Sequence, residues 1–303
     1  MEGLGAAYGH GARLAKGVGA CDTTKVGAFA RTAAGHEEAH ELGRGLLALL
    51  RDRQGREGLS GIGVAVPGFI LLKEGVVKNA NNIPALEGYP LRDDLENRLG
   101  AKVVLENDAN AAALGEKWMG TGRDVEDLIL LTLGTGVGGG IICRGKVLHG
   151  ALGMAGELGH ITVVPNGNPC GCGNHGCLEK HASATAVVAM AKLMGLGDNL
   201  TSESVYNLAM KGDPRAHEIF VSMGRYLGIA LATLINAFNF PLYLLGGGVL
   251  GAWNLFAPPM IEEVKQRSFT FRATNTRVEK AGLGNKSGLY GAAYLPWAGD
   301  MDS

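Results

Sequence analysis

Apolar positions along this chain form short aliphatic runs, which alternate with stretches in which apolar residues recur every three or four positions. The short runs predict buried strands, and the stretches with helical period predict helices. Strands are expected at residues 59–67, 102–105, 128–133, 140–143, 242–245 and 277–280. Helices are expected at residues 91–99, 108–118, 182–194, 215–238, 258–267 and 288–297.

The alternation of strands and helices is typical of an α/β protein with a largely parallel sheet. A chain of 303 residues is long enough for two domains at the usual size of roughly 150 residues each. The strand pattern restarts after the alanine-rich helix that begins at Asp108. We therefore expect a smaller N-terminal domain over residues 1–112 and 290–303, and a larger domain over residues 113–289. No tandem repeat is evident.

Charge and composition argue against several classes of protein. The chain has 28 basic and 29 acidic residues, so its charge favours neither a nucleic-acid partner nor an anionic membrane. No apolar run approaches the roughly 20 residues of a membrane span, and the N-terminus lacks a secretion pattern. We expect a reduced, cytoplasmic enzyme. The 49 glycines gather in loops after apolar runs, which is typical of a backbone that approaches ligands closely.

Four potential metal ligands lie in one short window of the sequence. One imidazole and three thiolates suit a tetrahedral Zn²⁺ ion, and four protein ligands close a site to water, so the metal would be structural. The ligands are His160, Cys170, Cys172 and Cys177. The alternatives are a disulfide or chance clustering, but a Cys-x-Cys pair is strained as a disulfide and the total of five cysteines is odd. Glu157 and Glu179 flank the window, and we expect the metal to hold them rigidly.

Two glycine-rich segments follow predicted strands. Residues 133–140 read L-G-T-G-V-G-G-G and formally match the dinucleotide pattern G-x-G-x-x-G. That motif needs a helix after it, whereas the residues that follow here are strand-like. We interpret the segment as a hairpin tip that offers N–H groups to a phosphate, with a plain glycine-rich hairpin as the alternative. The second segment, 246–248, fits ligand binding and tight helix–strand packing equally well.

The segment E-N-D-A-N at residues 106–110 comes directly after a predicted strand. Asp108 has the position of a simple helix cap, but Asn107 and Asn110 already offer caps. A carboxylate at a strand end can instead accept the proton of a substrate hydroxyl as a phosphoryl group arrives. The asparagines of the N-A-N-N segment at 79–82 add amide groups of the kind that bind sugars, although an ordinary loop also carries such residues.

Together these segments resemble the ROK family of bacterial sugar kinases, repressors and related proteins over residues 59–297. E-L-G-H at 157–160 matches the family's E-x-G-H element, and C-G-C-G-N-H-G-C-L-E at 170–179 matches its C-x-C-G-x-x-G-C-x-E element. The segments at 106–116, 131–140 and 245–249 look like its acceptor, phosphate and nucleotide-side elements. The residues of these segments are most similar to those of the glucokinase branch.

The resemblance implies an α/β fold of two actin-like, hexokinase-type (ribonuclease H-like) domains with a cleft between them. It implies a kinase that uses ATP and Mg²⁺ to phosphorylate the 6-hydroxyl of glucose or a related sugar, carries a structural Zn²⁺ ion and forms a homodimer. Asp108 would be the catalytic base. The sugar would be bound by Gly68, Asn82, Asn107, Asp108, Glu157, His160 and Glu179. ATP would be held by Gly134, Thr135, Gly136, Gly246, Gly247 and Gly248, and zinc by His160, Cys170, Cys172 and Cys177.

One segment departs from the family pattern. The family opens with a strand and D-x-G-G-T, which binds phosphate and helps to hold Mg²⁺, whereas residues 4–14 read L-G-A-A-Y-G-H-G-A-R-L, with Ala7 at the position of the aspartate. Either this loop is degenerate and leaves a catalytically impaired sugar-binding or sensing protein, or the N-terminal sequence is atypical of a working enzyme. An N-acetylhexosamine or fructose kinase is a further alternative. No helix-turn-helix pattern precedes the kinase-like region, so a DNA-binding regulator is not expected.

Overall fold

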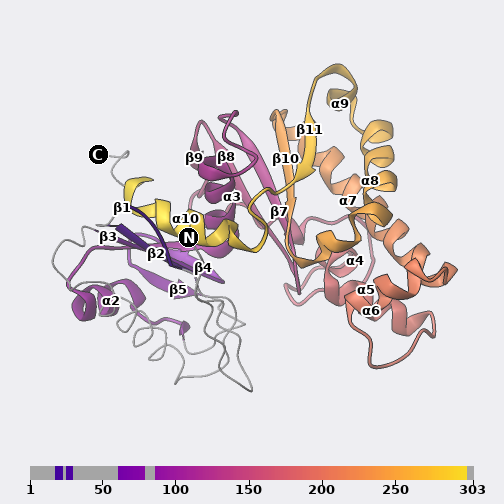
Figure 1. Ribbon diagram of the computed structural model, residues 1–303, viewed down its shortest axis with the longest axis horizontal. Coiled ribbons are helices and arrows are strands. Elements are labelled where there is room, and N and C mark those ends of the chain that lie inside the picture. Colours follow the sequence, from indigo (N-terminus) through magenta and orange to yellow (C-terminus); the bar gives the residue numbers. More distant parts are fainter. Residues whose placement is uncertain (1–17, 23–24, 30–60, 79–85, 299–303) are drawn as a thin grey trace. The chain divides into compact units, whose positions relative to one another are not determined.

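The computed structural model describes residues 18–22, 25–29, 61–78 and 86–298, and it divides into two compact units (Figure 1). Unit 1 comprises Met1–Glu126, Ile141–Ala155 and Lys286–Ser303, and unit 2 comprises Asp127–Gly140 and Gly156–Asn285. The expected boundaries at residues 112 and 289 fall near these divisions. The units differ from the expected domains because unit 1 also takes residues 113–126 and 141–155.

Unit 1 is built on a four-stranded sheet with the order β1-β2-β3-β6. Its strands are β1 (Val18–Asp22), β2 (Lys25–Phe29), β3 (Gly61–Val66) and β6 (Val103–Asn107). β1 pairs with β2 antiparallel, whereas β2, β3 and β6 are parallel. Its described residues also form an antiparallel hairpin and three helices: β4 (Phe69–Leu71), β5 (Val76–Lys78), α2 (Leu91–Leu99), α3 (Asp108–Met119) and α10 (Ser287–Ala298).

Strand β3 is buried along its whole length, as expected for a central strand of a parallel sheet that is covered on both faces. On one face its larger side chains pack in a cluster with Leu91, Leu95 and Leu99, which recur every four residues along α2. On the other face Ala65 contacts small residues of α3 and α10. A Cβ atom at Gly63 would lie 1.9 Å from the carbonyl oxygen of Ala292, so α10 packs directly on the backbone of β3.

Unit 2 is built on the sheet β11-β10-β7-β8-β9, in which β10 is parallel to both β7 and β11. The strands of this sheet are β7 (Leu128–Leu133), β8 (Val137–Cys143), β9 (Lys146–Val147), β10 (Leu242–Gly246) and β11 (Arg277–Lys280), of which β9 and the last residues of β8 belong to unit 1. The chain passes from unit 2 into unit 1 within β8. The helices are α4 (Glu179–Ala182), α5 (Ala184–Leu193), α6 (Ser202–Met210), α7 (Pro214–Phe238), α8 (Trp253–Arg267) and α9 (Phe269–Ala273). Short 3₁₀ turns are η2 (Leu158–His160), η3 (Gly248–Ala252) and η4 (Gly284–Lys286).

Helix α7 has clear start and stop signals. The Asp213 carboxylate accepts the N–H groups of Arg215 and Ala216, Pro214 occupies the first turn, and Asn239 ends the helix in a left-handed conformation. By length and composition alone, α7 is the one helix among the described residues that has the properties of a membrane span. However, 61% of its most apolar window is buried inside the protein, which is the arrangement of a core helix.

Several expected elements differ in their bounds. The helix expected at 182–194 is interrupted at Ser183, which is extended and whose hydroxyl caps α5 by accepting the Ala186 N–H group. The helix expected from residue 258 begins at Trp253, so Pro258 and Pro259 lie inside the helix and not in its first turn as the sequence pattern suggested. No strand was expected before residue 59, but β1 and β2 are present. The expected segments at 4–14 and 79–82 lie outside the described residues.

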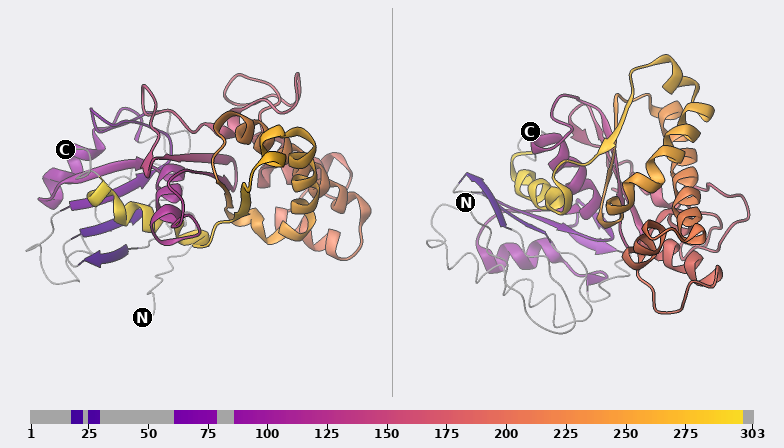
Figure 2. Two further views of the ribbon diagram at one scale, coloured as in Figure 1. Left: turned by 90° about the horizontal axis from the view of Figure 1, so that it is seen from above. Right: turned by 45° about the vertical axis from the view of Figure 1, so that its right-hand side comes forward.

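Helices α3 and α10 cross so closely that only glycine fits at two positions (Figures 1 and 2). A Cβ atom at Gly291 would lie 1.6 Å from the carbonyl oxygen of Ala111, and one at Gly115 would lie 2.1 Å from that of Ser287. The Glu116 carboxylate, which is fully buried, accepts the Ser287 hydroxyl at 2.7 Å across the same crossing. The start of α3 is therefore positioned by a helix from the far end of the sequence.

We predict that Gly291→Ala lowers the free energy of unfolding by about 1–3 kcal/mol, because a backbone oxygen cannot move away as a flexible side chain can. Chemical unfolding of both proteins measures the change. Gly251→Ala is the matched control, since a Cβ atom there meets nothing within 4 Å. Equal stability of the Gly291 variant and the parent protein would contradict the close crossing.

Candidate functional site

The junction between β6 and α3 carries the predicted acceptor residues in unit 1. Asn107 is the helix cap: its Oδ1 atom accepts the N–H groups of Ala109 at 2.9 Å and Asn110 at 3.2 Å. Its Nδ2–H group donates to the carbonyl oxygen of Gly68 at 3.1 Å. Gly68 has a φ of 100°, a conformation that favours glycine. The structure therefore brings together Gly68, Asn107 and Asp108, as the sequence suggested.

Asp108 is the first residue of α3 and lies half-buried at the carboxyl end of β6. Its Oδ1 atom also accepts the Ala109 N–H group, at 2.9 Å. Because this bond is to the backbone of the helix, the carboxylate is oriented by α3 itself. The sequence left open whether Asp108 caps the helix, and the structure gives the main capping role to Asn107.

Two residues that the sequence did not single out lie behind this junction. The buried carboxylate of Glu106 accepts the Asn107 N–H group at 2.8 Å and the Asn110 side-chain amide at 3.0 Å. Its other oxygen lies 2.6 Å from Nε2 of His149. The sequence placed Glu106 just after a predicted strand, whereas the structure places it inside β6, and nothing local pointed to His149.

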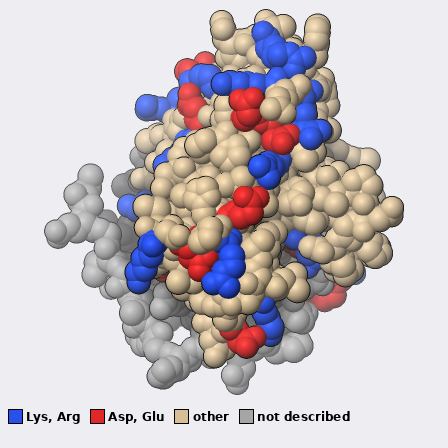
Figure 3. All heavy atoms as spheres, turned by 90° about the vertical axis from the view of Figure 1, so that its right-hand side faces the viewer, with Lys and Arg blue, Asp and Glu red and all other residues tan. Residues whose placement is uncertain are grey.

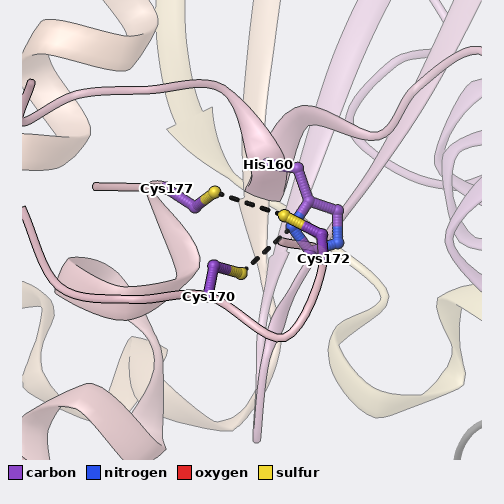
Figure 4. Close-up of side chains that lie close together, drawn as sticks. All are labelled: His160, Cys170, Cys172 and Cys177. Carbon is purple, nitrogen blue, oxygen red and sulfur yellow. Dashed lines mark hydrogen bonds between the residues drawn. The ribbon is translucent and has the colours of Figure 1, made fainter. Parts of the chain in front are cut away.

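The four predicted metal ligands converge in unit 2 (Figure 4). Their ligand atoms all lie within 4.8 Å of one another. Nδ1 of His160 is 3.6 Å from the Cys170 sulfur, and the Cys172 and Cys177 sulfurs are also 3.6 Å apart. Ligands at Zn–S and Zn–N bond lengths in a tetrahedron are separated by about 3.6–3.8 Å. The donor set and its spacing therefore fit a tetrahedral zinc ion.

The thiols are not equivalent when no metal is bound. Burial, reinforced by the neighbouring thiols of Cys172 and Cys170, raises the pKa of Cys177 to about 12. A hydrogen bond from the backbone N–H group of Asn174 instead lowers the pKa of Cys172, which is exposed. The three sulfurs consequently do not all carry charge at neutral pH without a cation. Among the described cysteines none is in a disulfide, which argues against the alternative that the sequence left open.

Glycines shape the loop that carries these thiols. Gly173 and Gly176 have φ values of 90° and 72°, which other residues rarely adopt. A Cβ atom at Gly176 would also lie 1.7 Å from the carbonyl oxygen of Val164. The two arms of the loop are bridged between Thr162 and Cys177. The spacing of the cysteines is therefore fixed by backbone geometry as well as by any bound metal.

The two flanking carboxylates have different partners. Nε2 of His160 lies 3.9 Å from a Glu157 oxygen, so the two ring nitrogens face in different directions, one to a carboxylate and one to the thiols. Glu179 is the first residue of α4, and its Oε2 atom accepts the Val137 N–H group at 3.2 Å. A Cβ atom at Gly136 would lie 2.2 Å from the same oxygen. Glu179 thus joins the cysteine loop to the glycine hairpin.

The glycine segment 134–136 connects β7 directly to β8, which confirms the interpretation of strand, glycine turn and strand. Its carbonyl groups are held from the helical side: Gly134 accepts the Ala184 N–H group at 2.9 Å, and Thr135 accepts the Thr185 hydroxyl at 2.7 Å. A Cβ atom at Gly134 would meet nothing within 4 Å. The outer side of the turn is therefore open among the described residues.

The second glycine segment separates into packing and open positions. Gly247 has a φ of 95°, and a Cβ atom there would lie 2.3 Å from the carbonyl oxygen of Leu133. Gly246 lies against Ala281, whereas Gly248 faces open space. Because β7, β10 and β11 are parallel, Gly134, Gly248 and the residues after Lys280 lie at the same edge of the sheet. Packing therefore requires glycine at Gly247 alone, and Gly248 remains the candidate for ligand contact.

Asn82 and the segment 7–11 lie outside the described residues. The other predicted site residues fall into two groups, one in each unit. Unit 1 holds Gly68, Asn107 and Asp108. Unit 2 holds Gly134, Thr135, Gly136, Glu157, His160, Cys170, Cys172, Cys177, Glu179, Gly246, Gly247 and Gly248.

These features define a two-domain α/β protein with a His–Cys₃ cluster and a glycine turn at the end of a parallel strand. The chain belongs to the ROK family, whose model matches residues 27–298. It has the two-domain, actin-like fold of that family.

Three relatives illustrate the likeness. A glucokinase from Halalkalibacterium halodurans is 40% identical over 252 residues, which cover 78% of this chain and 76% of that protein. The crystal structure of a ROK family glucokinase from Streptomyces griseus in complex with glucose and AMPPNP has a TM-score of 0.71 and 34% identity, and the match covers 93% of this chain and 99% of that one. A xylose repressor from Caldicellulosiruptor bescii is 34% identical over 247 residues, which cover 78% of this chain and 62% of the repressor. The glucokinases support a ROK sugar kinase, while the repressor leaves the particular substrate open.

His181, which follows Glu179 on α4, provides a prediction about pH. It is buried, its ring centroid lies 4.6 Å from that of Tyr226 with the rings tilted by 46°, and burial lowers its pKa. The unfolded chain therefore binds a proton more readily than the folded one. The contribution of His181 to the stability of the protein is fully present above its pKa in the unfolded chain, about 6.5. This contribution declines as the pH falls below that value toward the lower pKa of the folded protein.

We predict that His181→Leu reduces the loss of unfolding free energy between about pH 7 and pH 5, by up to about 1.4 kcal/mol per pH unit, the slope for one proton. Urea unfolding at several pH values measures this difference. His217→Leu is the control, because His217 is exposed on α7. The same pH dependence in the His181 variant and the parent would show that His181 is not held neutral.

Proposed function

We propose that this protein is an ATP- and Mg²⁺-dependent hexose kinase that phosphorylates the 6-hydroxyl group of glucose. The position of Asp108 carries the proposal: a half-buried carboxylate at a strand end, oriented by the first turn of α3, in a chain related to glucokinases. A carboxylate in that position serves as the base that accepts the hydroxyl proton during phosphoryl transfer. The Streptomyces griseus relative was crystallised with glucose and a nucleotide, which supports this pair of substrates.

The sugar contacts are proposed residue by residue. Asn107 uses one Nδ2–H group on the Gly68 carbonyl, and we assign the other to a sugar hydroxyl. Glu157 and His160 offer a carboxylate and a ring nitrogen that lie 3.9 Å apart, a spacing that suits recognition of adjacent hydroxyl groups. Gly68, Asn82 and Glu179 complete the proposed set.

The nucleotide contacts are proposed at the open edge of the parallel strands. N–H groups of Gly134, Thr135 and Gly136 and the Thr135 hydroxyl would bind the phosphates, and Mg²⁺ bound with ATP neutralises their charge. Gly248 offers a further backbone contact, with Gly246 and Gly247 holding it in place. The link from Glu179 to Val137 makes the phosphate turn and the cysteine loop one structural assembly.

We further propose a structural Zn²⁺ ion held by His160, Cys170, Cys172 and Cys177. Zinc would replace the protons of the three thiols and fix the loop from which Glu157 and Glu179 project. Four protein ligands leave no open position, so the metal would take no part in phosphoryl transfer. A homodimer remains a prediction of the family resemblance. On the face in Figure 3, basic and acidic side chains are interspersed.

Asp108→Ala should lower kcat at least about 100-fold, because the proton acceptor is lost, while glucose affinity stays within a few-fold. A coupled assay of ADP release across glucose, mannose, fructose, N-acetylglucosamine and N-acetylmannosamine measures turnover, and calorimetry measures sugar binding. Asp93→Asn is the control, because Asp93 is exposed on α2 and pairs with Arg92.

Turnover with none of these sugars by the parent protein would reject the kinase. Sugar binding without turnover would instead support the sensing protein. Full activity of the Asp108 variant would remove that residue from the proposed role while leaving a kinase in place.

Metal analysis of the purified protein should find about one zinc per chain. Cys172→Ser should lower this content and the unfolding temperature, because one of the four ligands is lost. Cys143→Ser should retain the metal, since Cys143 lies outside the cluster. Zinc retention should also fall as the pH is lowered, because protons compete for thiols such as Cys177, whose pKa is raised to about 12 by burial. A protein without zinc at neutral pH would contradict this assignment.

A further inference from the structure

Glu106 is an ionisable side chain with an unusual degree of burial for its position beside the proposed base. It is the penultimate residue of β6, two positions before Asp108, and only 4% of its surface is exposed. A buried carboxylate is costly unless hydrogen bonds or an opposite charge compensate for its lost hydration. The contacts of Glu106 should therefore include the groups that compensate for its lost hydration.

The two carboxylate oxygens of Glu106 make three polar contacts, two with neighbouring residues of the chain and one with His149. Oε1 accepts the backbone N–H group of Asn107 at 2.8 Å and the side-chain amide of Asn110 at 3.0 Å. Oε2 meets Nε2 of His149 at 2.6 Å, a short contact of the kind seen when a charge assists the bond. Within the described part of the chain, this is the only ion pair of Glu106. The carboxylate thus ties His149 to the first residues of α3.

His149 is itself held in a defined turn after β9. Its carbonyl oxygen accepts the Ala155 N–H group at 3.0 Å, and the preceding Leu148 N–H group donates to Ile141 at 2.8 Å. Gly150 follows with a φ of 69°, so the chain turns sharply directly after His149. The imidazole therefore approaches Glu106 from a fixed backbone, and is not a freely mobile surface side chain.

Asn110 shows that the carboxylate sets the orientation of its neighbours. Its amide nitrogen donates to Glu106, whereas its Oδ1 atom is buried without a hydrogen-bond partner in the described structure. Turning the amide over would place that oxygen against the Glu106 carboxylate and lose the donor. The orientation of the Asn110 amide is therefore set by its hydrogen bond to Glu106, although this orientation leaves Oδ1 without a partner.

We propose that His149 is a positioning residue for the acceptor segment: through Glu106 it fixes the Asn107–Asp108 junction. His149 acts through Glu106, whose hydrogen bond to the Asn107 N–H group holds the backbone from which Asp108 projects. This inference rests on the proposed role of Asp108. Loss of His149 removes a hydrogen-bond partner of Glu106, loosens the junction and reduces the time that Asp108 spends in reach of the substrate hydroxyl.

The test compares His149→Leu, which lacks a donor, with His149→Gln, whose terminal amide can reach Glu106 from the same side. His149→Leu should lower kcat about 10- to 100-fold, as expected for a displaced reacting group, while KM for glucose changes less than about threefold. His149→Gln should restore most of kcat. His217→Leu, an exposed histidine on α7, is the matched control for a histidine-to-leucine change.

A second measurement does not depend on turnover. Amide hydrogen exchange of peptides that contain residues 103–112 should be faster in His149→Leu than in the parent protein or His149→Gln, because the N–H groups of Asn107 and Ala109 lose protection. Exchange in the α7 peptides should be unchanged. Unaltered exchange at 103–112, or an equal loss of kcat in the leucine and glutamine variants, would overturn the positioning role. A parent protein that turns over no sugar would refute the kinase, and the exchange measurement would still decide the role of His149.

Discussion

The close approach of three backbones in unit 1 is the constraint on which its site depends. α10 packs directly on the backbones of β3 and α3 through Gly63, Gly115 and Gly291. Interiors packed to this density transmit small displacements, because no flexible side chain can absorb them. Asp108 begins one of these helices, so its position is set by the sheet beneath it and by the helix that crosses it. The hydrogen bonds at the β6–α3 junction then refine an arrangement that packing has already fixed.

In unit 2 a polar contact connects the segments of the candidate site. The cysteine loop leads directly into α4, whereas the glycine turn lies about 40 positions earlier in the sequence. The carboxylate of Glu179, the first residue of α4, connects the two by accepting the Val137 N–H group. The same residue leaves no room for a side chain at Gly136. A glycine at that position therefore has a steric reason besides any contact with phosphate. The two explanations apply to the same residue and do not compete.

Local patterns in the sequence were sufficient to predict the elements that depend mainly on residues nearby in the sequence. The period of α7, the aliphatic run of β7 and the spacing of the cysteines each predicted what the structure shows. β1 and β2 were missed because a strand's preference depends on its partners, and β2 is paired in parallel with β3. His149 was missed for the same reason, since its partner Glu106 is 43 positions away. The two interpretations of the glycines at 246–248 were separable only once Leu133 was seen against Gly247.

The placement of α10 has a consequence for the order in which the protein is made. Unit 1 contains the first residues of the chain, but α10 reaches it only after the whole of unit 2 has been synthesised. Domains generally fold as units while the ribosome is still adding residues. Unit 2 can therefore fold on the nascent chain, whereas the apolar face of β3 waits uncovered for its last helix. The junction that holds Asp108 acquires the support of α10 only after unit 2 has been synthesised.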